Sequence, residues 1–380
     1  MKLVLGYSGS FESSAAIPWL KDRFNAELVA VTLDLGQRRE LVEVRERALA
    51  LGALRCHVID VREELARQHI LPALQAGVLF GECRQMSTAL EQPLIVKKLL
   101  EVARMERAGG IAHAHPPGTI DHARFERAAR ALDPSITVIG ALDDPGLSPG
   151  GLPEYARIHE IPSPSDDDRG AHANLWGRSS AWHPSDDPAG VPVESRYTLT
   201  RSAAGCPTQP AFIAIEFEAG VPVKANGIEM PLVEMIESLE TIAGAHGVGR
   251  LDIAVDAATG STSRELSEAP AAAVLHAAHR ELQSLVMARE LEPIAQTVTR
   301  TYAGLIGDGH WFTPAREALD AFVGAIQRHV TGSIRLELFK GDCRAVERES
   351  APAQATPSGV DATADRFDPA AEQLGTAEGR

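Results

Sequence analysis

The sequence "YSGSFESS", residues 7–14, follows a short apolar run, "KLVLG" (2–6), and leads into a helical pattern, "AAIPWLKDRF" (15–24). A strand, a turn of small residues and a helix in succession direct free backbone N–H groups at one point, where the helix dipole also favours negative charge. The turn therefore predicts a phosphate site, although it is neither a G-x-x-x-x-G-K-[ST] nor a G-x-G-x-x-G motif. The alternative is that its serines only cap the helix.

Size and composition indicate a globular protein of two domains. The chain has 380 residues, of which 44% are apolar and 23% charged, so two ordinary cores can form. A net charge of -15 repels phosphates at long range and argues against a general binder of nucleic acids or acidic membranes. No apolar run approaches the roughly 20 residues of a membrane span, and no signal-peptide core is present, so we expect a cytoplasmic protein.

The cysteines support the same expectation. They lack C-x-x-C spacing, which predicts a reducing compartment without a disulfide framework. They are Cys56, Cys83, Cys206 and Cys343.

Short apolar runs alternate with helical patterns over the first 142 residues. The runs are rich in β-branched residues and lie at 3–7, 27–35, 54–60, 110–115 and 136–142. Apolar residues at three-to-four spacing predict helices over 13–24, 38–52, 61–77, 88–107 and 121–132. This alternation predicts an α/β fold with a doubly wound parallel sheet and right-handed crossovers.

The remainder of the chain has a different pattern. Residues 143–210 are rich in Pro, Gly, Ser and Asp, which predicts loops. A β-hairpin is predicted over 211–227 with its turn at Ala219-Gly220, and a second one over 333–348 with its turn at Lys340-Gly341. A long helix is predicted near 269–296 between them.

The turn at residues 7–14 resembles the S-G-G-x-D-[ST]-S pyrophosphate loop of N-type ATP pyrophosphatases, and its flanks resemble argininosuccinate synthases. Segments similar to that family follow one another in order from residue 1 to residue 350. They include "VTLDLGQ" (31–37), "STALEQPLIVKKL" (87–99), "NLWGRS" (174–179), "IAGAHGVGRLDI" (242–253) and "VTGSIRLELFKG" (330–341). On these segments the chain is identified as a member of the argininosuccinate synthase family.

The resemblance implies an N-type ATP pyrophosphatase-like nucleotide-binding domain over 1–165 and an α+β synthetase and multimerisation domain over 166–350. A disordered acidic tail is expected over 351–380, because bulky apolar groups are scarce there. The family's reaction is ATP-dependent ligation. The ureido oxygen of citrulline attacks the α-phosphate, pyrophosphate leaves, and the amine of aspartate displaces AMP. Mg²⁺ is implied to offset the phosphate charge, and a homotetramer is implied as the assembly.

Carried over by position, the resemblance implies a pyrophosphate site with Glu12 as a catalytic residue. The implied loop residues are Ser8, Gly9, Ser10, Glu12, Ser13 and Ser14. Ser10 stands where the family has a second glycine, and would cost roughly 1–2 kcal/mol if that position needs a positive φ. The nucleotide side is implied to comprise Thr32, Leu33, Asp34 and Ala114. The alternative for the first three is an ordinary strand end.

The substrate positions depart further from the family. The family's H-G-x-T-G-K-G-N-D-Q-x-R-F-E reads "HAHPPGTIDHARFE" at 113–126. Asp121 and Arg124 are kept, and catalytic and substrate-binding roles are implied for both. Pro116 and Ile120 replace a threonine and an asparagine, so each substrate group left unpaired would cost about 1–3 kcal/mol. Of the other implied substrate positions, Thr88 and Ser179 are kept, whereas Arg84, Gly170 and His172 are changed.

Two interpretations fit these changes. One is a ligase whose substrates differ from citrulline and aspartate, and the other is a catalytically silent paralogue that serves as a nucleotide-binding scaffold or regulator. Arg84 could bind a carboxylate or phosphate, or could be a solvated surface group. A thiolation reaction would need a reactive cysteine, and only Cys83 is expected near the pocket.

Four histidines, at positions 113, 115, 122 and 172, lie in the predicted substrate segments. On a strand, "HAH" directs both imidazoles to one face without a clear third ligand, so no metal site is expected. A general-base or hydrogen-bonding role is expected for one of them instead.

Overall fold

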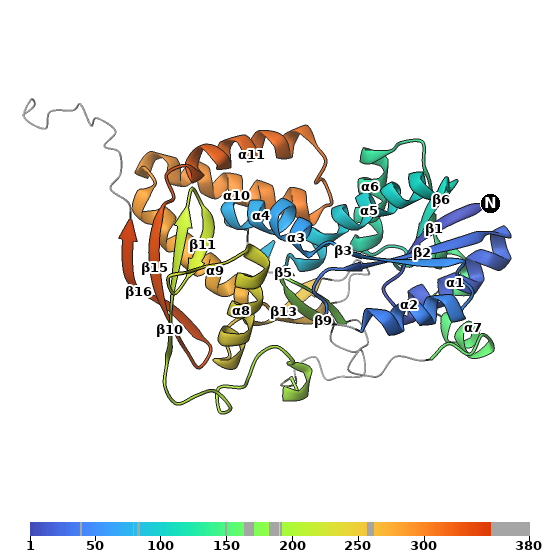
Figure 1. Ribbon diagram of the computed structural model, residues 1–380, viewed down its shortest axis with the longest axis horizontal. Coiled ribbons are helices and arrows are strands. Elements are labelled where there is room, and N and C mark those ends of the chain that lie inside the picture. Colours follow the sequence, from blue (N-terminus) through green and yellow to red (C-terminus); the bar gives the residue numbers. More distant parts are fainter. Residues whose placement is uncertain are drawn as a thin grey trace, which may run out of the picture.

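Five parallel strands form the first sheet, in the order β3-β2-β1-β6-β7 (Figure 1). The strands are β1 (Lys2–Gly6), β2 (Glu27–Asp34), β3 (Arg55–Asp60), β6 (Gly110–His113) and β7 (Thr137–Gly140). The computed structural model describes residues 1–38, 40–78, 80–81, 84–148, 150–162, 171–181, 190, 192–256 and 262–350. The α/β class and all five predicted strands are confirmed. Because the strand order reverses beside β1, ligands are expected at the carboxyl ends of β1 and β6.

Helices pack on both faces of this sheet. Along β1, Leu3 and Leu5 belong to the apolar cluster that includes α1, whereas Val4 belongs to the cluster that includes α5, as the alternation of side chains in a strand requires. The helices are α1 (Phe11–Phe24), α2 (Leu41–Ala50), α5 (Ser87–Glu106), α6 (Ile120–Leu132) and α7 (Leu152–Ile158). The helix predicted over 61–77 consists of α3 (Arg62–Leu65), a π-helical turn η1 (Ala66–Ile70) and α4 (Leu71–Gln75).

The second sheet is antiparallel, in the order β12-β11-β10-β15-β16. Its strands are β10 (Ala211–Glu218), β11 (Val221–Ala225), β12 (Ile228–Glu229), β15 (Gly332–Phe339) and β16 (Asp342–Ser350). Both predicted hairpins are confirmed. Ala219 and Gly220 have φ values of 48° and 77°, and Lys340 and Gly341 have 49° and 95°. Two consecutive positive φ values match the twist of the flanking strands in a two-residue hairpin turn.

The single helix predicted near 269–296 is wrong. The structure has α9 (Pro270–Val286), a 3₁₀ turn η5 (Arg289–Leu291) and α10 (Glu292–Gly307) instead. Met287 and Ala288 are extended, with ψ values of 132° and 139°. Pro293 has no N–H to donate and therefore suits the first turn of a new helix better than the interior of a long one.

A third, antiparallel sheet lies between these two, in the order β13-β14-β9-β8. Its strands are β8 (Ala171–Asn174), β9 (Gly177–Ala181), β13 (Arg250–Asp256) and β14 (Thr262–Glu268). The N–H of Leu175, in the β8–β9 turn, donates to the carbonyl of Leu35 at 2.6 Å, directly after β2. This bond ties the third sheet to the carboxyl edge of the first. The remaining helices of the described residues are α8 (Leu232–Ala245) and α11 (Pro314–Gln327).

One apolar cluster continues from the first sheet into the second. It contains Val4 of β1 and Phe125 of α6, Trp176 of the β8–β9 turn, and Ile215 and Leu336 of the second sheet, all at most 1% exposed. The two halves of the chain therefore share a core.

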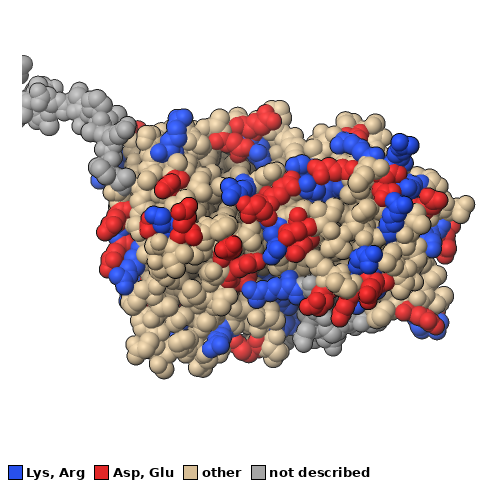
Figure 2. Space-filling view, viewed as in Figure 1, with Lys and Arg blue, Asp and Glu red and all other residues tan. Residues whose placement is uncertain are grey.

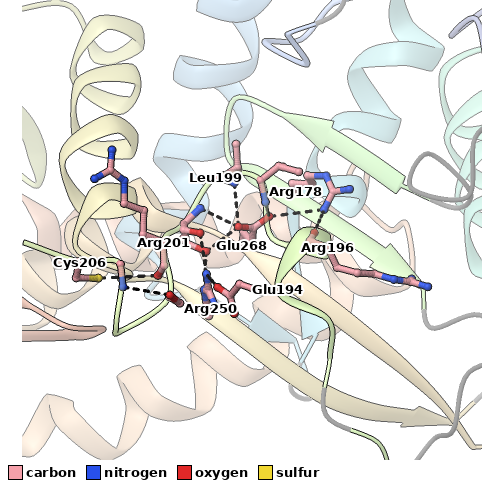
Figure 3. A network of polar contacts seen from close by, with 12 residues as sticks. Arg178, Glu194, Arg196, Leu199, Arg201, Cys206, Arg250 and Glu268 are labelled. Carbon is pink, nitrogen blue, oxygen red and sulfur yellow. Dashed lines mark hydrogen bonds and ion pairs between the residues drawn. The ribbon is translucent and has the colours of Figure 1, made fainter.

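The carboxylate of Glu268, at the end of β14, holds the segment Thr198–Thr200 in place (Figure 3). Glu268 is 1% exposed. It accepts the backbone N–H groups of Thr198, Leu199 and Thr200, each at 2.9 Å, and the hydroxyl of Thr200 at 2.7 Å. Arg178 Nη1 lies 3.6 Å from Glu268 Oε2. Successive amides around one carboxylate form an anion-binding concavity, filled here by the protein's own side chain.

Surface charge is mixed. Figure 2 shows acidic and basic side chains interspersed on the face that it draws. Among the described residues, no helix combines the length and the apolar character needed to cross a bilayer.

Candidate functional site

The turn between β1 and α1 contains one residue in the left-handed region. Gly9 has φ 74°, whereas Ser10 has φ -69° and ψ 165°, so Ser10 carries none of the strain considered for it. Ser10 is the N-cap of α1, and its hydroxyl oxygen accepts the N–H of Ser13 at 3.2 Å. Ser10 therefore caps α1, and this cap leaves the anion-attracting helix terminus in place. Glu12 lies in the first turn of α1 and is partly exposed.

Serine hydroxyls within this turn bond to one another. Ser13 and Ser14 are 3% and 2% exposed. Ser14 Oγ lies 3.2 Å from Tyr7 Oη, and Ser13 Oγ lies 3.2 Å from the hydroxyl of Ser10 and 3.4 Å from that of Ser8. Ser8 is exposed and Ser10 is partly exposed. A phosphate can therefore reach Ser8 and Ser10 directly, whereas Ser13 and Ser14 are buried.

Replacing Gly9 by alanine is expected to lower the free energy of unfolding by more than the about 1–2 kcal/mol of left-handed backbone strain. The added Cβ would lie 3.1 Å from both γ-carbons of Val44. Gly118→Ala is the matched control, because Gly118 has φ 78° but nothing within 4 Å of its Cβ position. Urea unfolding of both variants separates the cost of the positive φ, which both share, from the cost of the contact with Val44, which only Gly9→Ala has. Equal losses would contradict a steric role for Val44.

The carboxyl end of β2 carries the predicted nucleotide positions. Thr32 is 1% exposed and its hydroxyl donates to the carbonyl of Tyr7 at 2.9 Å, so it joins the end of β2 to that of β1. Leu33 is 7% exposed. Asp34 is partly exposed, and its Oδ1 accepts the N–H of Gly36 at 3.0 Å. Of the three side chains, Asp34 is the one best able to meet a ligand.

The connection from β6 to α6 carries Ala114, Pro116 and Ile120, and all three are partly exposed. The Pro116 carbonyl accepts the hydroxyl of Thr119 at 2.7 Å, and Thr119 caps α6 by accepting the N–H of His122 at 3.3 Å. These contacts order the connection without a polar side chain at positions 116 and 120.

Asp121 and Arg124 form an ion pair at the start of α6, with 2.8 Å between Asp121 Oδ1 and Arg124 Nη1. Arg124 is 8% exposed and also donates from Nε to the carbonyl of Gly307, at the end of α10, at 2.7 Å. Burial alone would raise the pKa of Asp121, but Arg124, with smaller contributions from His115 and His172, holds that pKa below its usual value. Asp121 is therefore an anion at neutral pH.

The third sheet supplies the other side of this cluster. His172 on β8 is paired across the strands with Ser179 on β9, which is 8% exposed. Both β8 and α6 pack against α5, and His172 makes a small contribution to lowering the pKa of Asp121 at the start of α6. Thr88, in the first turn of α5, is partly buried.

The two other predicted substrate positions are Arg84 and Gly170. Arg84 belongs to β5 (Arg84–Gln85), which pairs with β4 (Phe80–Gly81). Gly170 lies outside the described residues, as does Cys83.

Glu91 on α5 is a polar residue that the sequence reasoning missed. It is 8% exposed, and its Oε2 accepts a hydrogen bond from Asn174 Nδ2 at 2.7 Å. Burial raises the pKa of Glu91 to about 8, with Asp121 adding to the increase and Asn174 and Arg124 opposing it. A carboxyl group that titrates near neutrality beside this ion pair is suited to move a proton. The sequence signal that could have revealed Glu91 is an acidic residue on the face of α5 that is directed towards the core.

Removing this carboxyl is expected to change how stability depends on pH. The raised pKa means that folded protein holds the Glu91 proton where unfolded protein has released it. The contribution of protonated Glu91 to the free energy of unfolding is therefore fully present below about pH 4.5, and it is lost as the pH rises towards 8. Relative to Glu91→Gln, the wild-type free energy of unfolding should fall by up to about 1.4 kcal/mol per pH unit in that window. Urea unfolding at several pH values measures this, with Glu101→Gln on the exposed side of α5 as the control. Parallel pH curves for wild type and Glu91→Gln would contradict it.

The histidines are arranged differently from the expectation. His113 ends β6, and His115 lies beyond the strand, so the two do not share one strand face. His113 instead approaches His122, with ring centroids 4.9 Å apart. Burial, with His115 and His122 nearby, lowers the pKa of His113 to about 2, so its imidazole is neutral. The rings of His113 and His115 lie 5.3 Å apart, but the ligand atoms that come together belong to His113, His122 and Glu126, a group that does not include His115.

A cavity of about 380 Å³ lies elsewhere, and its lining shares no residue with the predicted site. Lys97 and Arg316 line it, but Lys97 donates to Glu64 at 2.7 Å and Arg316 donates to Asp320 at 2.6 Å. Arg104, the third cation of the lining, also has a carboxylate partner, Asp133. The group formed by Asp121, Arg124 and Glu91 is therefore the better candidate site.

Sequence profiles of known families cover nearly the whole chain. That of the arginosuccinate synthase N-terminal HUP domain matches residues 2–162, and that of the arginosuccinate synthase C-terminal domain matches residues 170–373. The chain belongs to the argininosuccinate synthase family. Argininosuccinate synthases from Rubrobacter xylanophilus and Geobacillus thermodenitrificans are each 42% identical to it, over 92% of this chain and 86% of theirs. That from Oceanobacillus iheyensis is 38% identical, over 92% of this chain and 84% of its own.

In this member of the argininosuccinate synthase family, substrate positions that match the family pattern lie close to positions that depart from it. The kept pair Asp121 and Arg124 is joined by an ion pair, and the changed positions Pro116 and Ile120 lie just before it in the same connection and helix start. The changed His172 acts electrostatically on Asp121. Some of the changed positions thus lie around one ion pair.

Proposed function

We propose that this protein is an ATP-dependent ligase of the argininosuccinate synthase type. It adenylates a carbonyl, ureido or carboxyl oxygen with release of pyrophosphate. It then joins the carbon that bears this oxygen to an amine, with release of AMP. The observation that carries the proposal is the Asp121–Arg124 pair at the start of α6, the helix that follows β6, because β6 pairs with β1 and β1 leads into the serine-rich turn. Membership of the family supports the same reaction.

The turn after β1 has the chemistry that a pyrophosphate group requires. The N-terminus of α1 offers backbone N–H groups and a favourable dipole, and Ser8 and Ser10 add hydroxyl donors. Ser13 and Ser14 support the turn from beneath. Glu12, whose carboxylate is a hard oxygen ligand, would hold the Mg²⁺ that accompanies ATP, and this ion would offset negative charge on the leaving pyrophosphate.

The remaining ATP contacts are proposed at the sheet edge. Asp34 would meet the nucleoside, with Thr32 and Leu33 shaping the strand end beneath it, and Ala114 would line the opposite side at the end of β6. Arg124 would stabilise negative charge that develops during transfer, and Asp121 keeps its guanidinium in position. Thr88 and Ser179 are proposed to bind the amino-acid-like substrates.

We propose further that the substrates are not citrulline and aspartate. Pro116 and Ile120 offer no side-chain hydrogen bond, while His172 and Arg84 introduce a polar ring and a cation. A substrate with fewer polar groups towards positions 116 and 120 fits these residues better. The proposal extends to a cytoplasmic homotetramer with a nucleotide-binding domain over 1–165 and a synthetase domain over 166–350.

Pyrophosphate release from Mg²⁺-ATP tests the proposal. The purified protein is assayed alone, with citrulline and aspartate, and with a panel of ureas, carboxylates and amines. Release with another pair is expected, and Glu12→Gln should reduce it, whereas Glu43→Gln, in the exposed first turn of the neighbouring α2, should not. Release with citrulline and aspartate would refute the substrate change. Absence of release with every pair would point to a silent paralogue, whether or not the protein still binds ATP.

A further inference from the structure

We propose that His113, His122 and Glu126 form a binding site for a transition-metal ion of the zinc type. His113 ends β6, and His122 and Glu126 are four residues apart on α6, so their side chains share one face of the helix. One ligand atom from each residue lies within 4.8 Å of those of the other two. Small side-chain movements then reach a common ion, because Zn–N and Zn–O bonds measure about 2.0–2.2 Å.

The imidazole of His113 gives independent support for a ligand. It is 2% exposed, and among the described residues its Nε2 has no hydrogen-bond partner. Its Nδ1 accepts the backbone N–H of His115 at 3.2 Å, so the ring proton of the metal-free protein is on Nε2. A buried N–H without an acceptor is unfavourable. A metal ion at Nε2 removes this defect. The ring proton then moves to Nδ1, and the contact with His115 opens as three metal–ligand bonds form.

Asp143 prepares His122 for the same role. His122 Nε2 lies 3.1 Å from Asp143 Oδ1 and 3.4 Å from Oδ2. The carboxylate holds the ring proton on Nε2, which leaves the lone pair of Nδ1 free for a metal, as in carboxylate–histidine–metal arrangements. Oε2 of Glu126 accepts a hydrogen bond from Arg130 at 3.0 Å, and Arg130 is an exposed residue. The carboxylate has a second oxygen with which to bind an ion.

The ligand set indicates the class of ion. Two imidazoles and one carboxylate suit Zn²⁺, Co²⁺ or Ni²⁺, whereas Mg²⁺ prefers oxygen ligands alone. Three protein ligands leave a further position for water or for an atom of a bound molecule. Phe125, whose ring centroid is 4.4 Å from that of His113, forms an apolar wall. This site is separate from the Glu12 position proposed for the ion that accompanies ATP.

Metal titration tests the proposal without any assay of ligase activity. The untagged full chain is stripped with a chelator, dialysed, and titrated with Zn²⁺ by calorimetry and with Co²⁺ by visible absorption, in the absence of nucleotide. One ion per chain is expected, together with a rise in thermal midpoint on adding Zn²⁺. His122→Gln and Glu126→Gln should each weaken Zn²⁺ binding by more than about 100-fold, and Asp143→Asn by about 10–100-fold.

Two further variants make the result specific. His115→Gln should bind Zn²⁺ like wild type, because the His115 ring is not a proposed ligand, and so should His159→Gln on the distant α7 cap. Asp143 is largely exposed, so Asp143→Asn remains informative if a ligand variant fails to fold. Wild-type affinity in both His122→Gln and Glu126→Gln would overturn the proposal, as would absence of binding by the wild-type chain. Weakening by His115→Gln alone would assign the ion to a different ligand set and would equally overturn it.

Discussion

Replacing Glu268 by alanine is expected to lower the free energy of unfolding by about 3–5 kcal/mol. The substitution leaves three backbone N–H groups and the Thr200 hydroxyl without the acceptor that they share. It also removes a carboxylate whose Oε2 lies 3.6 Å from Arg178 Nη1. Water would have to enter a site where Glu268 itself is 1% exposed. Urea unfolding followed by circular dichroism measures the change.

Two variants show whether the carboxylate is responsible. Glu268→Gln keeps the shape but presents an NH₂ donor in place of one acceptor oxygen, so about half of the alanine effect is expected. Glu347→Gln removes an exposed ion pair with Arg335 and should cost less than about 1 kcal/mol. A loss of less than 1 kcal/mol in Glu268→Ala would show that the Thr198–Thr200 segment finds its hydrogen bonds elsewhere.

Replacing Arg124 by methionine is expected to reduce ATP-dependent pyrophosphate release by at least about 100-fold, the scale seen when one donor to a developing charge is removed. This expectation rests on the proposed ligase activity. The same variant leaves Asp121 half-buried without its cation, so the pKa of Asp121 should rise above its wild-type value. The rate that remains should consequently fall at a higher pH than in wild type when the solution is acidified.

Arg127 provides the matched control for Arg124. It is also on α6, is exposed, and donates to the carbonyl of Asp308, next to the Gly307 carbonyl that Arg124 contacts. Arg127→Met should therefore weaken the α6–α10 contact while leaving pyrophosphate release within a few-fold of wild type. Equal losses in both variants would mean that Arg124 acts by joining the helices and not on the reacting groups.

Local signals in the sequence accounted for much of the fold. The five strands of the first sheet were predictable because each is a short β-branched run between helical patterns. The hairpin turns at Ala219-Gly220 and Lys340-Gly341 were predictable because a glycine tolerates the positive φ that such turns require. The break after Val286 was missed because helix-forming residues continue past it, although Pro293 marks where the next helix begins.

The site was less predictable, because its contacts join segments far apart in the chain. Glu91 is buried because Asn174, more than 80 residues later, packs against it. His113 meets His122 and Glu126 because α6 turns back along the end of β6, which residue spacing does not reveal. The positions taken from the family located the Asp121–Arg124 pair, whereas the groups specific to this chain emerged from the three-dimensional arrangement.

The shared apolar cluster determines how the protein unfolds. Because Val4, Trp176 and Leu336 belong to one core, neither half of the chain can lose its structure without exposing apolar surface on the other. Thermal denaturation should therefore be a single cooperative transition. A fragment ending near residue 162 would expose the apolar side chains of α4 and α5 that pack against the rest of the chain, and should aggregate.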